Sequence, residues 1–243
     1  MGTIVFCYSL LATEPNWTLT TGIFSEYLAR PGFDLYDKPV SQNEITASWH
    51  GLYGGIWSSS ALEYSSTIKY GQEFQTYIGL KKPIGWITLD GNIRYDALKE
   101  LSSDKDDLWM VDMRMDITKM SFIQPYIATR YFHPVSSEKP TSGWFVWFGA
   151  RRIQDIGFGF PHCNRITLIV DGSVTHSDGV LSRDPGWVYS RFCLQMNIPV
   201  SKHLTISPQF TTQIPLDDQN KGHHPYTDGT DHFVGSITAT LRF

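Results

Sequence analysis

Apolar and polar residues alternate with a period of two along most of this chain. The clearest segment is 204–215, in which Leu204, Ile206 and Phe210 share one face while polar residues such as Gln209 occupy the other. Such alternation is typical of β-strands with one apolar face, and no segment has a convincing helical period. The pattern therefore predicts an all-β protein.

About twelve segments carry this alternation, and several approach the 9–11 residues with which a tilted strand crosses a bilayer. Ordinary soluble strands are shorter. We predict strands at residues 16–28, 43–49, 52–58, 72–81, 86–96, 107–117, 121–132, 143–152, 165–175, 187–197, 203–215 and 233–243.

The connections between these segments alternate between long and short. The long ones are rich in Gly, Pro, Asp and Ser and cover about 29–42, 59–71, 97–106, 133–142, 176–186 and 216–232. The short ones lie near 50–51, 82–85, 118–120 and 199–202, and the connection 153–164 breaks the rule. In an up-and-down barrel every second connection lies at the same end, so this rhythm predicts a transmembrane barrel with short turns at one end and long loops at the other. A soluble β-sandwich, which has no reason to alternate in this way, remains the alternative fold.

Composition agrees with a membrane barrel and excludes a nucleic-acid-binding surface. Charged residues make up 18% of the chain, aromatic residues 14%, and the net charge is −4 without any Lys/Arg cluster. Seven tryptophans lie near predicted strand ends, where the aromatic girdles of a membrane barrel would place them, although edges of a soluble core would also do so. They are Trp17, Trp49, Trp57, Trp86, Trp109, Trp144 and Trp187.

Charged residues of both signs occupy the polar faces of the predicted strands. On a membrane barrel the apolar face meets lipid and these residues line the lumen, whereas on a soluble protein they would be ordinary surface. The candidate pore-lining residues are Glu73, Asp90, Arg94, Asp112, Arg114, Asp116, Arg130 and Arg191. Because both signs occur on adjacent strands, we expect cross-strand ion pairs and no strong ion selectivity. Phe145 or Trp147, together with Tyr77, are candidate obstructions of a lumen of this size.

Residues 1–13 are interpreted separately from the barrel domain, which we assign to 14–243. They have an apolar core but no basic start, so we interpret them as the remaining part of an export signal peptide, with an ordinary N-terminal strand as the alternative. The three cysteines have no metal-binding spacing. Cys163 and Cys193 either form a disulfide in an oxidising compartment or remain free.

The sequence contains no phosphate-binding loop, zinc motif or nucleophile elbow, so we predict no enzymatic activity, cofactor or metal. In the segment THSDG, Ser177 directly follows His176, and in a strand their side chains would face opposite ways. A catalytic Ser–His pair needs hydrogen-bond distance, so lipid hydrolysis is the least favoured alternative. The last long loop carries five potential ligands without a spacing that fixes a metal geometry, namely His223, His224, Asp228, Asp231 and His232.

The stretch 51–96 resembles the TorF-like porin family of bacterial outer membranes. That family shows an aromatic-Gly-X-Trp-Ser-Ser strand, an acidic-X-X-X-Tyr-X-Gly strand, a turn with Gly and a strand ending in Tyr. The matching residues are Tyr53, Gly55, Trp57, Ser58, Ser59, Glu73, Tyr77, Gly79, Gly85 and Tyr95. The match covers mainly the first 100 residues and the last strand, and the family's Arg-Gly element is interrupted here by Pro31. The resemblance implies an integral outer-membrane protein with a pore role.

The segment FVGSITATLRF, residues 233–243, is an amphipathic strand with an aromatic last residue. In this it resembles the outer-membrane barrel class, whose assembly machinery reads a C-terminal strand of this kind. The resemblance implies that Phe243 is an assembly signal and that the partners are this machinery and outer-membrane lipid. The predicted function is a small-solute porin in the outer membrane of a Gram-negative bacterium. A non-conducting surface receptor or structural anchor remains the alternative.

Overall fold

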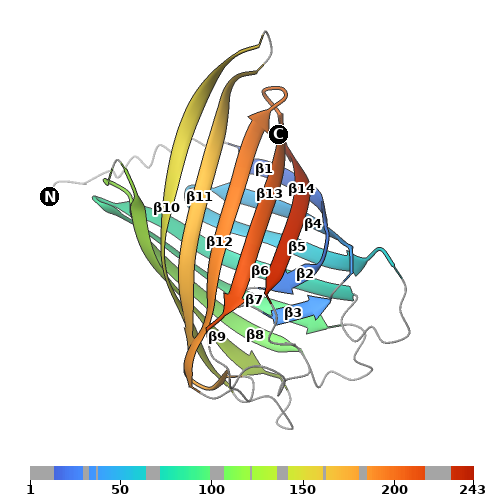
Figure 1. The fold of residues 1–243 in the computed structure, drawn as a ribbon, viewed down its shortest axis with the longest axis vertical. Coiled ribbons are helices and arrows are strands. Elements are labelled where there is room, and N and C mark those ends of the chain that lie inside the picture. Colours follow the sequence, from blue (N-terminus) through green and yellow to red (C-terminus); the bar gives the residue numbers. More distant parts are fainter. Residues whose placement is uncertain are drawn as a thin grey trace, which may run out of the picture.

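The structure is a computed structural model that describes residues 14–29, 33–36, 38–63, 72–98, 107–120, 122–135, 142–160, 163–180, 185–216 and 231–243. Among these residues, twelve strands form a closed antiparallel barrel, and two short strands form a separate sheet (Figure 1). No helix in the described part of the chain is long and apolar enough to cross a membrane. The predicted export signal, 1–13, lies outside the described residues.

Wall strands that are consecutive in the chain are also hydrogen-bonded neighbours in the barrel. The wall strands are β1 (Asn16–Phe24), β4 (Val40–Trp49), β5 (Leu52–Ala61), β6 (Gln72–Ile84), β7 (Ile87–Leu98), β8 (Leu108–Ile117), β9 (Gln124–Pro134), β10 (Gly143–Phe160), β11 (Cys163–Ser177), β12 (Gly186–Pro199), β13 (Leu204–Pro215) and β14 (His232–Arg242). Their order around the barrel is β1-β14-β13-β12-β11-β10-β9-β8-β7-β6-β5-β4. This confirms the predicted up-and-down barrel.

The last strand closes the barrel against the first. On β1, Thr18 faces Arg242 and Phe24 faces Ser236 of β14, while the other edge of β1 pairs with β4. The backbone N–H of Phe243 donates to the carbonyl of Trp17 at 3.0 Å. Closure satisfies the backbone groups of both terminal strands, which an open edge in hydrocarbon would leave unpaired.

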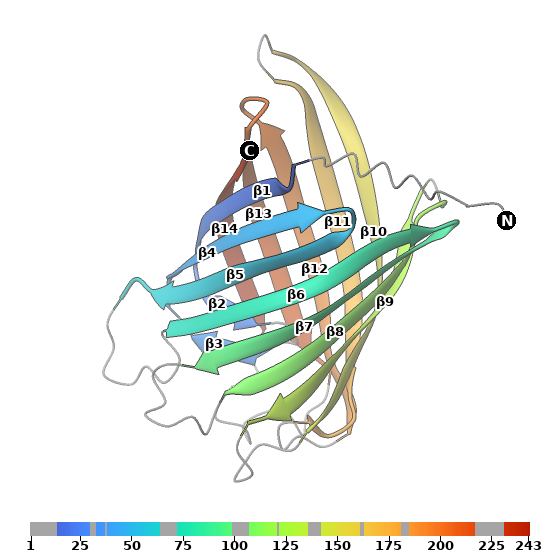
Figure 2. The same ribbon diagram turned by 180° about the vertical axis from the view of Figure 1, so that it is seen from behind.

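The first strand is shorter than the predicted strand 16–28. β1 ends at Phe24 instead of residue 28, and a small sheet of β2 (Tyr27–Ala29) and β3 (Phe33–Tyr36) follows before β4. This sheet lies at the long-loop end of the barrel (Figure 2). The chain therefore leaves the wall early and folds back before it returns to it.

The predicted connection 153–164 is wrong, because β10 and β11 continue through it as a hairpin. Their pairing runs on from Ile153 facing Ile169 to Gly157 facing Arg165. Two residues separate the two strands. The hairpin extends past the neighbouring turns at the end of the barrel where the C-terminus lies (Figures 1 and 2). The connection therefore obeys the alternation of short and long that it seemed to break.

The short turns are built from residues that tolerate positive φ. Between β4 and β5, His50 and Gly51 have φ of 50° and 90°, as the two-residue turn of a twisted hairpin requires. A Cβ at Gly51 would lie 2.6 Å from the carbonyl oxygen of Lys81, so a larger residue does not fit there. The turn thereby fixes the register of β4 against β5.

Large apolar side chains are exposed on the outer face of most barrel strands, as on a barrel embedded in lipid. They include Ile23, Ile45, Ile56, Ile78, Ile93, Met113, Phe148, Phe192, Phe210 and Ile237. Five of the tryptophans predicted for the girdles are exposed, namely Trp17, Trp49, Trp86, Trp109 and Trp187. A sixth, Trp144, packs against Tyr131. Trp57 is the exception, because it lies inside the barrel against Tyr27 and Val40.

Cys193 is a free cysteine in the middle of β12, where Asp171 and Thr211 are its neighbours on the adjacent strands. Cys163 begins β11 at the tip of the extended hairpin, opposite Phe160. The two cysteines therefore lie far apart along the barrel, and the disulfide alternative is not supported.

Candidate functional site: the barrel interior

The eight candidate pore-lining residues lie on the inner face of the wall. Along β7 and β8 they alternate with outward residues such as Ile93 and Met113, which are about half exposed. Glu73 and Asp116 are buried. Asp90 lines one interior cavity and Arg191 lines another.

Three inward tyrosines lie flat against the wall because each faces a glycine on the neighbouring strand. The pairs are Tyr53 with Gly79, Tyr77 with Gly55 and Tyr126 with Gly149. A Cβ at Gly55, Gly79 or Gly149 would lie 2.5, 2.5 or 2.3 Å from an atom of the facing tyrosine. The glycines therefore provide the space in which the rings lie.

Each of these tyrosines crosses the strand that carries its glycine and reaches a carboxylate on the strand beyond. The hydroxyls donate from Tyr53 to Asp90 at 2.5 Å, from Tyr77 to Glu44 at 2.6 Å and from Tyr126 to Asp171 at 2.8 Å. Hydrogen bonds to ionised acceptors are stronger than neutral ones, so they hold the rings in place. The expectation that Tyr77 obstructs the lumen is therefore wrong, because its ring lies along the wall.

Replacing Gly149 by alanine is expected to displace the Tyr126 ring toward the lumen and to break its bond to Asp171. Overpacking of this kind costs about 1–3 kcal/mol, and the displaced ring should also reduce ion conductance. Unfolding in urea and single-channel recording measure the two effects. Gly157→Ala is the matched control, because a Cβ at Gly157 on the same strand meets nothing within 4 Å. Equal behaviour of the two variants would contradict the packing argument.

Asp112 is the centre of a cross-strand ion network on the charged side of the lumen. Arg130 donates to both of its oxygens, with Nε–Oδ1 at 2.5 Å and Nη2–Oδ2 at 2.8 Å, and Arg94 Nε lies 3.8 Å from Oδ2. The side chains of Arg130 and Asp112 are 14% and 19% exposed. The predicted pairing between these neighbouring strands is thus confirmed.

A second ion network surrounds Asp116. Arg114 on the same strand donates to both carboxylate oxygens of Asp116 at 2.8 and 2.9 Å. Nη2 of Arg151, on β10, lies 3.1 Å from Oδ1 of Asp116. The Arg114 guanidinium also lies 3.8 Å from the centroid of the Tyr126 ring. Asp90 pairs at 3.9 Å with Lys81, a partner that the sequence did not single out.

The opposite side of the lumen is lined mainly by hydroxyl and amide groups. On β1 and β12–β14 the inward residues include Thr20, Gln195, Asn197, Ser207, Gln209, Thr211, Gln213, Ser236 and Thr240. Thr20 and Thr240 share a hydrogen bond of 3.1 Å, and Ser207 donates to Asn197 at 2.8 Å. A solute in this lumen would therefore meet paired ions on one side and neutral polar groups on the other.

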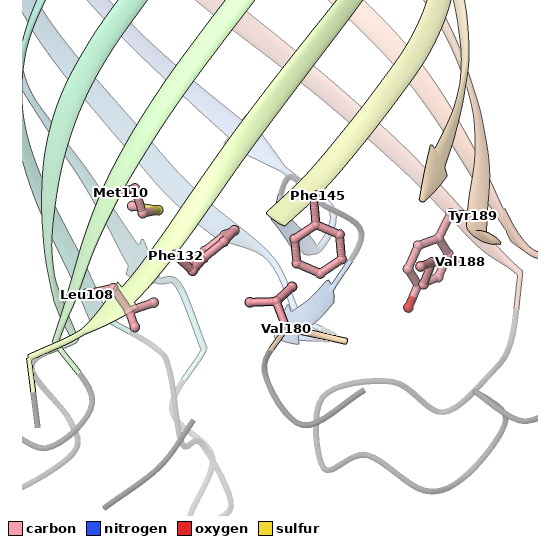
Figure 3. Packing of buried hydrophobic residues seen from close by; sticks show 7 residues of the cluster. All are labelled: Leu108, Met110, Phe132, Phe145, Val180, Val188 and Tyr189. Atoms are coloured by element: carbon pink, nitrogen blue, oxygen red, sulfur yellow. The ribbon is translucent and has the colours of Figure 1, made fainter. Parts of the chain in front are cut away.

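An apolar cluster occupies the inner face near the long-loop end (Figure 3). Its members are Leu108, Met110, Phe132, Phe145, Val180, Val188 and Tyr189, and Trp147 packs against them. Phe145 has no exposed surface and faces Val180, which belongs to the connection after β11 (Figure 3). Both aromatic residues proposed as obstructions, Phe145 and Trp147, therefore face inward.

Residues 26–28, between β1 and β4, lie inside the barrel at the same end. Tyr27 of β2 is buried, packs against Trp57 at a ring-centroid distance of 5.8 Å, and donates its hydroxyl to Glu73 on β6. Burial, followed by the charges of Glu73 and Asp96, raises the pKa of the Tyr27 hydroxyl well above its usual value. This hydroxyl therefore remains a neutral donor at neutral pH.

A second contact holds the start of the same segment beside β14, the strand that pairs with β1. Glu26 lies 3.4 Å from Nδ1 of His232 on β14. A cavity of about 50 Å³ remains between this segment and wall residues that include Gln42, Arg191 and Thr211. The described part of the segment thus contacts the wall at β14 and at β6, on either side of β1, β4 and β5.

The lumen widens toward the short turns into a vestibule of about 660 Å³. Its lining includes Glu44, Tyr53, Tyr77, Lys81, Asp90 and Thr88, together with His50 and Gly51 of the first short turn. Within the described residues, the interior is therefore open at the short-turn end and narrowed at the long-loop end.

The segment THSDG, 175–179, and the histidine-containing last loop form no catalytic arrangement among the described residues. The His176 ring packs edge-on against Trp187 at 5.3 Å, whereas Ser177 is fully buried and its Oγ accepts a bond from the N–H of Gly179. Residues 217–230, with His223, His224 and Asp228, lie outside the described residues.

No protein-family model matches this chain, and no curated protein matches its sequence. Among solved structures it is similar to the KdgM porin in complex with disordered oligogalacturonate, with a TM-score of 0.57 and 5% identity over 94% of this chain and 99% of that one. It is also similar to the NanC porin, with a TM-score of 0.56 and 8% identity over 93% and 98%. At these identities the similarity is one of fold, and this barrel shares the fold of those porins.

Proposed function

We propose that this protein is a porin of a bacterial outer membrane that lets small polar solutes pass, and that it belongs with the TorF-like porins that residues 51–96 resemble. The observation that carries the proposal is the vestibule of about 660 Å³, whose lining includes Glu44, Lys81 and Asp90, in a barrel whose inner face carries charged and hydroxyl groups. The apolar exterior and the porin fold of the KdgM and NanC structures support the location.

Short saccharides are the solute class that we propose. The KdgM porin is described with an oligogalacturonate, and the hydroxyl and amide wall of this lumen offers many partners to a polyhydroxylated solute. The cations and anions of the opposite wall are largely paired with one another, as Asp112 is with Arg94 and Arg130. We therefore expect weak discrimination between small cations and anions.

Planar-bilayer recording and vesicle swelling test this function. The proposal expects discrete conductance steps, a reversal potential close to zero in a KCl gradient, and faster swelling with monosaccharides than with larger saccharides. Absence of both steps and swelling across many insertions would instead support a non-conducting receptor or anchor. The narrowed long-loop end is the observation that favours this second function.

We also propose that Phe243 acts in assembly, with the barrel-assembly machinery as partner. Its ring is 72% exposed on the outside of the closing seam, where it contributes little packing within the barrel. Deleting Phe243 is expected to lower the amount of inserted protein more than it lowers the urea resistance of protein already inserted. Phe243→Tyr, which keeps an aromatic ring, serves as control. Equal membrane levels of the parent and the deletion variant would contradict this role.

A further inference from the structure

The outer surface at the short-turn end of β6–β10 carries three cations beside strongly exposed aromatic rings. The cation patch, as we call it, consists of Lys82, Lys119 and Arg152 with Trp86 and Phe122. Trp86 and Phe122 are 68% and 67% exposed. Lys119 Nζ lies 5.6 Å from the Trp86 ring centroid, and the Arg152 guanidinium lies 4.2 Å from that of Phe122.

The members of the patch are neighbours along one arc of the barrel rim. The N–H of Thr118 donates to the carbonyl of Trp86 at 2.8 Å, which joins the β6–β7 turn to the β8–β9 connection. Gln124, at the start of β9, faces Arg151 of β10, which places Phe122 beside Arg152. Lys82 is on the outer face of β6, because it faces the outward Leu89. The three cations therefore form one surface.

The charge of this surface is not neutralised by the described carboxylates around it. In the wall portion of β6–β10 these carboxylates lie on the inner face, namely Glu73, Asp90, Asp96, Asp112 and Asp116. Further along β10, Asp155 pairs with Arg165. No ion pair among the described residues involves Lys82, Lys119 or Arg152. Toward lipid, this arc thus presents three positive charges.

We propose that the cation patch binds the anionic headgroups of phospholipids in the leaflet at the short-turn end. The apolar outer wall continues directly into the patch through Ile84 and Met120, both 49% exposed, so acyl chains along the wall bring headgroups to the cations. Exposed aromatic rings settle at the headgroup level of a bilayer, and lysine and arginine extend toward the same level. Basic residues at such a surface attract anionic lipid. The proposal requires the barrel to lie in a membrane but not to conduct, so failure of the porin assays would leave it intact.

The test compares lipid selectivity of the full chain reconstituted in phosphatidylcholine bilayers. Spin-labelled phosphatidylglycerol and phosphatidylcholine report the relative association of each lipid with the protein. We expect a preference for phosphatidylglycerol of about fivefold, falling toward one in K82Q/K119Q/R152Q and weakening in high salt. The control K38Q/K202Q/R242Q removes three cations elsewhere and should keep the preference.

Two results would overturn the proposal: an unchanged preference in the patch variant, or an equal loss in the control, which would indicate diffuse rim charge. Heat-modified migration on gels verifies that each variant forms the barrel before the measurement. If the triple variant does not fold, the single variants K82Q, K119Q and R152Q replace it. Each should then lose part of the preference, and three unchanged values would reject the patch.

Discussion

Replacing Tyr27 by alanine is expected to raise the single-channel conductance severalfold. Tyr27 lies at the narrowed end of the lumen, where it packs against Trp57 and Val40 and donates to Glu73. Without the ring and its hydrogen bond, the segment between β1 and β4 loses its attachment to β6. Recording in planar bilayers at fixed salt measures the change.

Two further variants serve as controls. One distinguishes the effect of the Tyr27 ring from that of its hydrogen bond, and the other tests whether loss of any tyrosine changes conductance. Tyr27→Phe keeps the packing against Trp57 and should raise conductance less than Tyr27→Ala. Tyr131→Ala removes a tyrosine from the outer side of β9, where it packs against Trp144, and should leave conductance unchanged. If Tyr27→Ala conducts like the parent, this segment does not limit passage.

Replacing Asp112 by asparagine is expected to destabilise the barrel by about 3–5 kcal/mol, the effect of breaking a largely buried ion pair by removing one partner. Arg130 loses two charge-assisted hydrogen bonds, and Arg94 loses its nearest anion. Neither guanidinium can regain full hydration, because both side chains are less than one fifth exposed. Urea unfolding of the refolded barrel in lipid vesicles measures the loss.

The surface pair Asp155–Arg165 offers a matched control for this prediction. The Arg165 side chain is 67% exposed, and exposed pairs contribute about 0–1 kcal/mol, so Asp155→Asn should have little effect. Combining Asp112→Leu with Arg130→Met should recover part of the loss, since no unpaired charge then remains at Arg130. Comparable stability of the Asp112→Asn and Asp155→Asn variants would refute the role of the network.

The period-two pattern predicted the faces of the strands reliably for a geometric reason. Successive side chains of a strand point to opposite sides whatever surrounds them, so Asp112 and Arg114 had to lie together opposite Met113. Register between neighbours then followed from short turns such as His50–Gly51. The Asp112–Arg130 pair, which joins two strands connected at the short-turn end, follows from those two facts, whereas β7 and β8 are joined by a long connection.

The same reasoning failed where the pattern along one strand was weak. In β10 the consecutive Arg151 and Arg152 and the glycines near the tip interrupt the alternation, so the strand was predicted to stop where it continues. Trp57 was assigned to the girdle from its place near a strand end, although it shares a face with the inward Tyr53. Applying the alternation strictly along β5 would have placed both residues inside the barrel.

The sequence by itself determined the fold class, the two unlike ends of the barrel and the shared face of charged residues such as Asp112 and Arg114, because these depend on local alternation and loop length. Only the tertiary structure revealed the tyrosines lying on glycines, the apolar cluster around Phe145 and the segment that brings Tyr27 to Glu73. The hydroxyls of these tyrosines bond to carboxylates two strands away, and the cluster and the Tyr27–Glu73 bond likewise join strands or loops that are not successive in the chain. The physical reason is that closure of the barrel decides which side chains share the interior, and no pattern along a single strand records its distant partners.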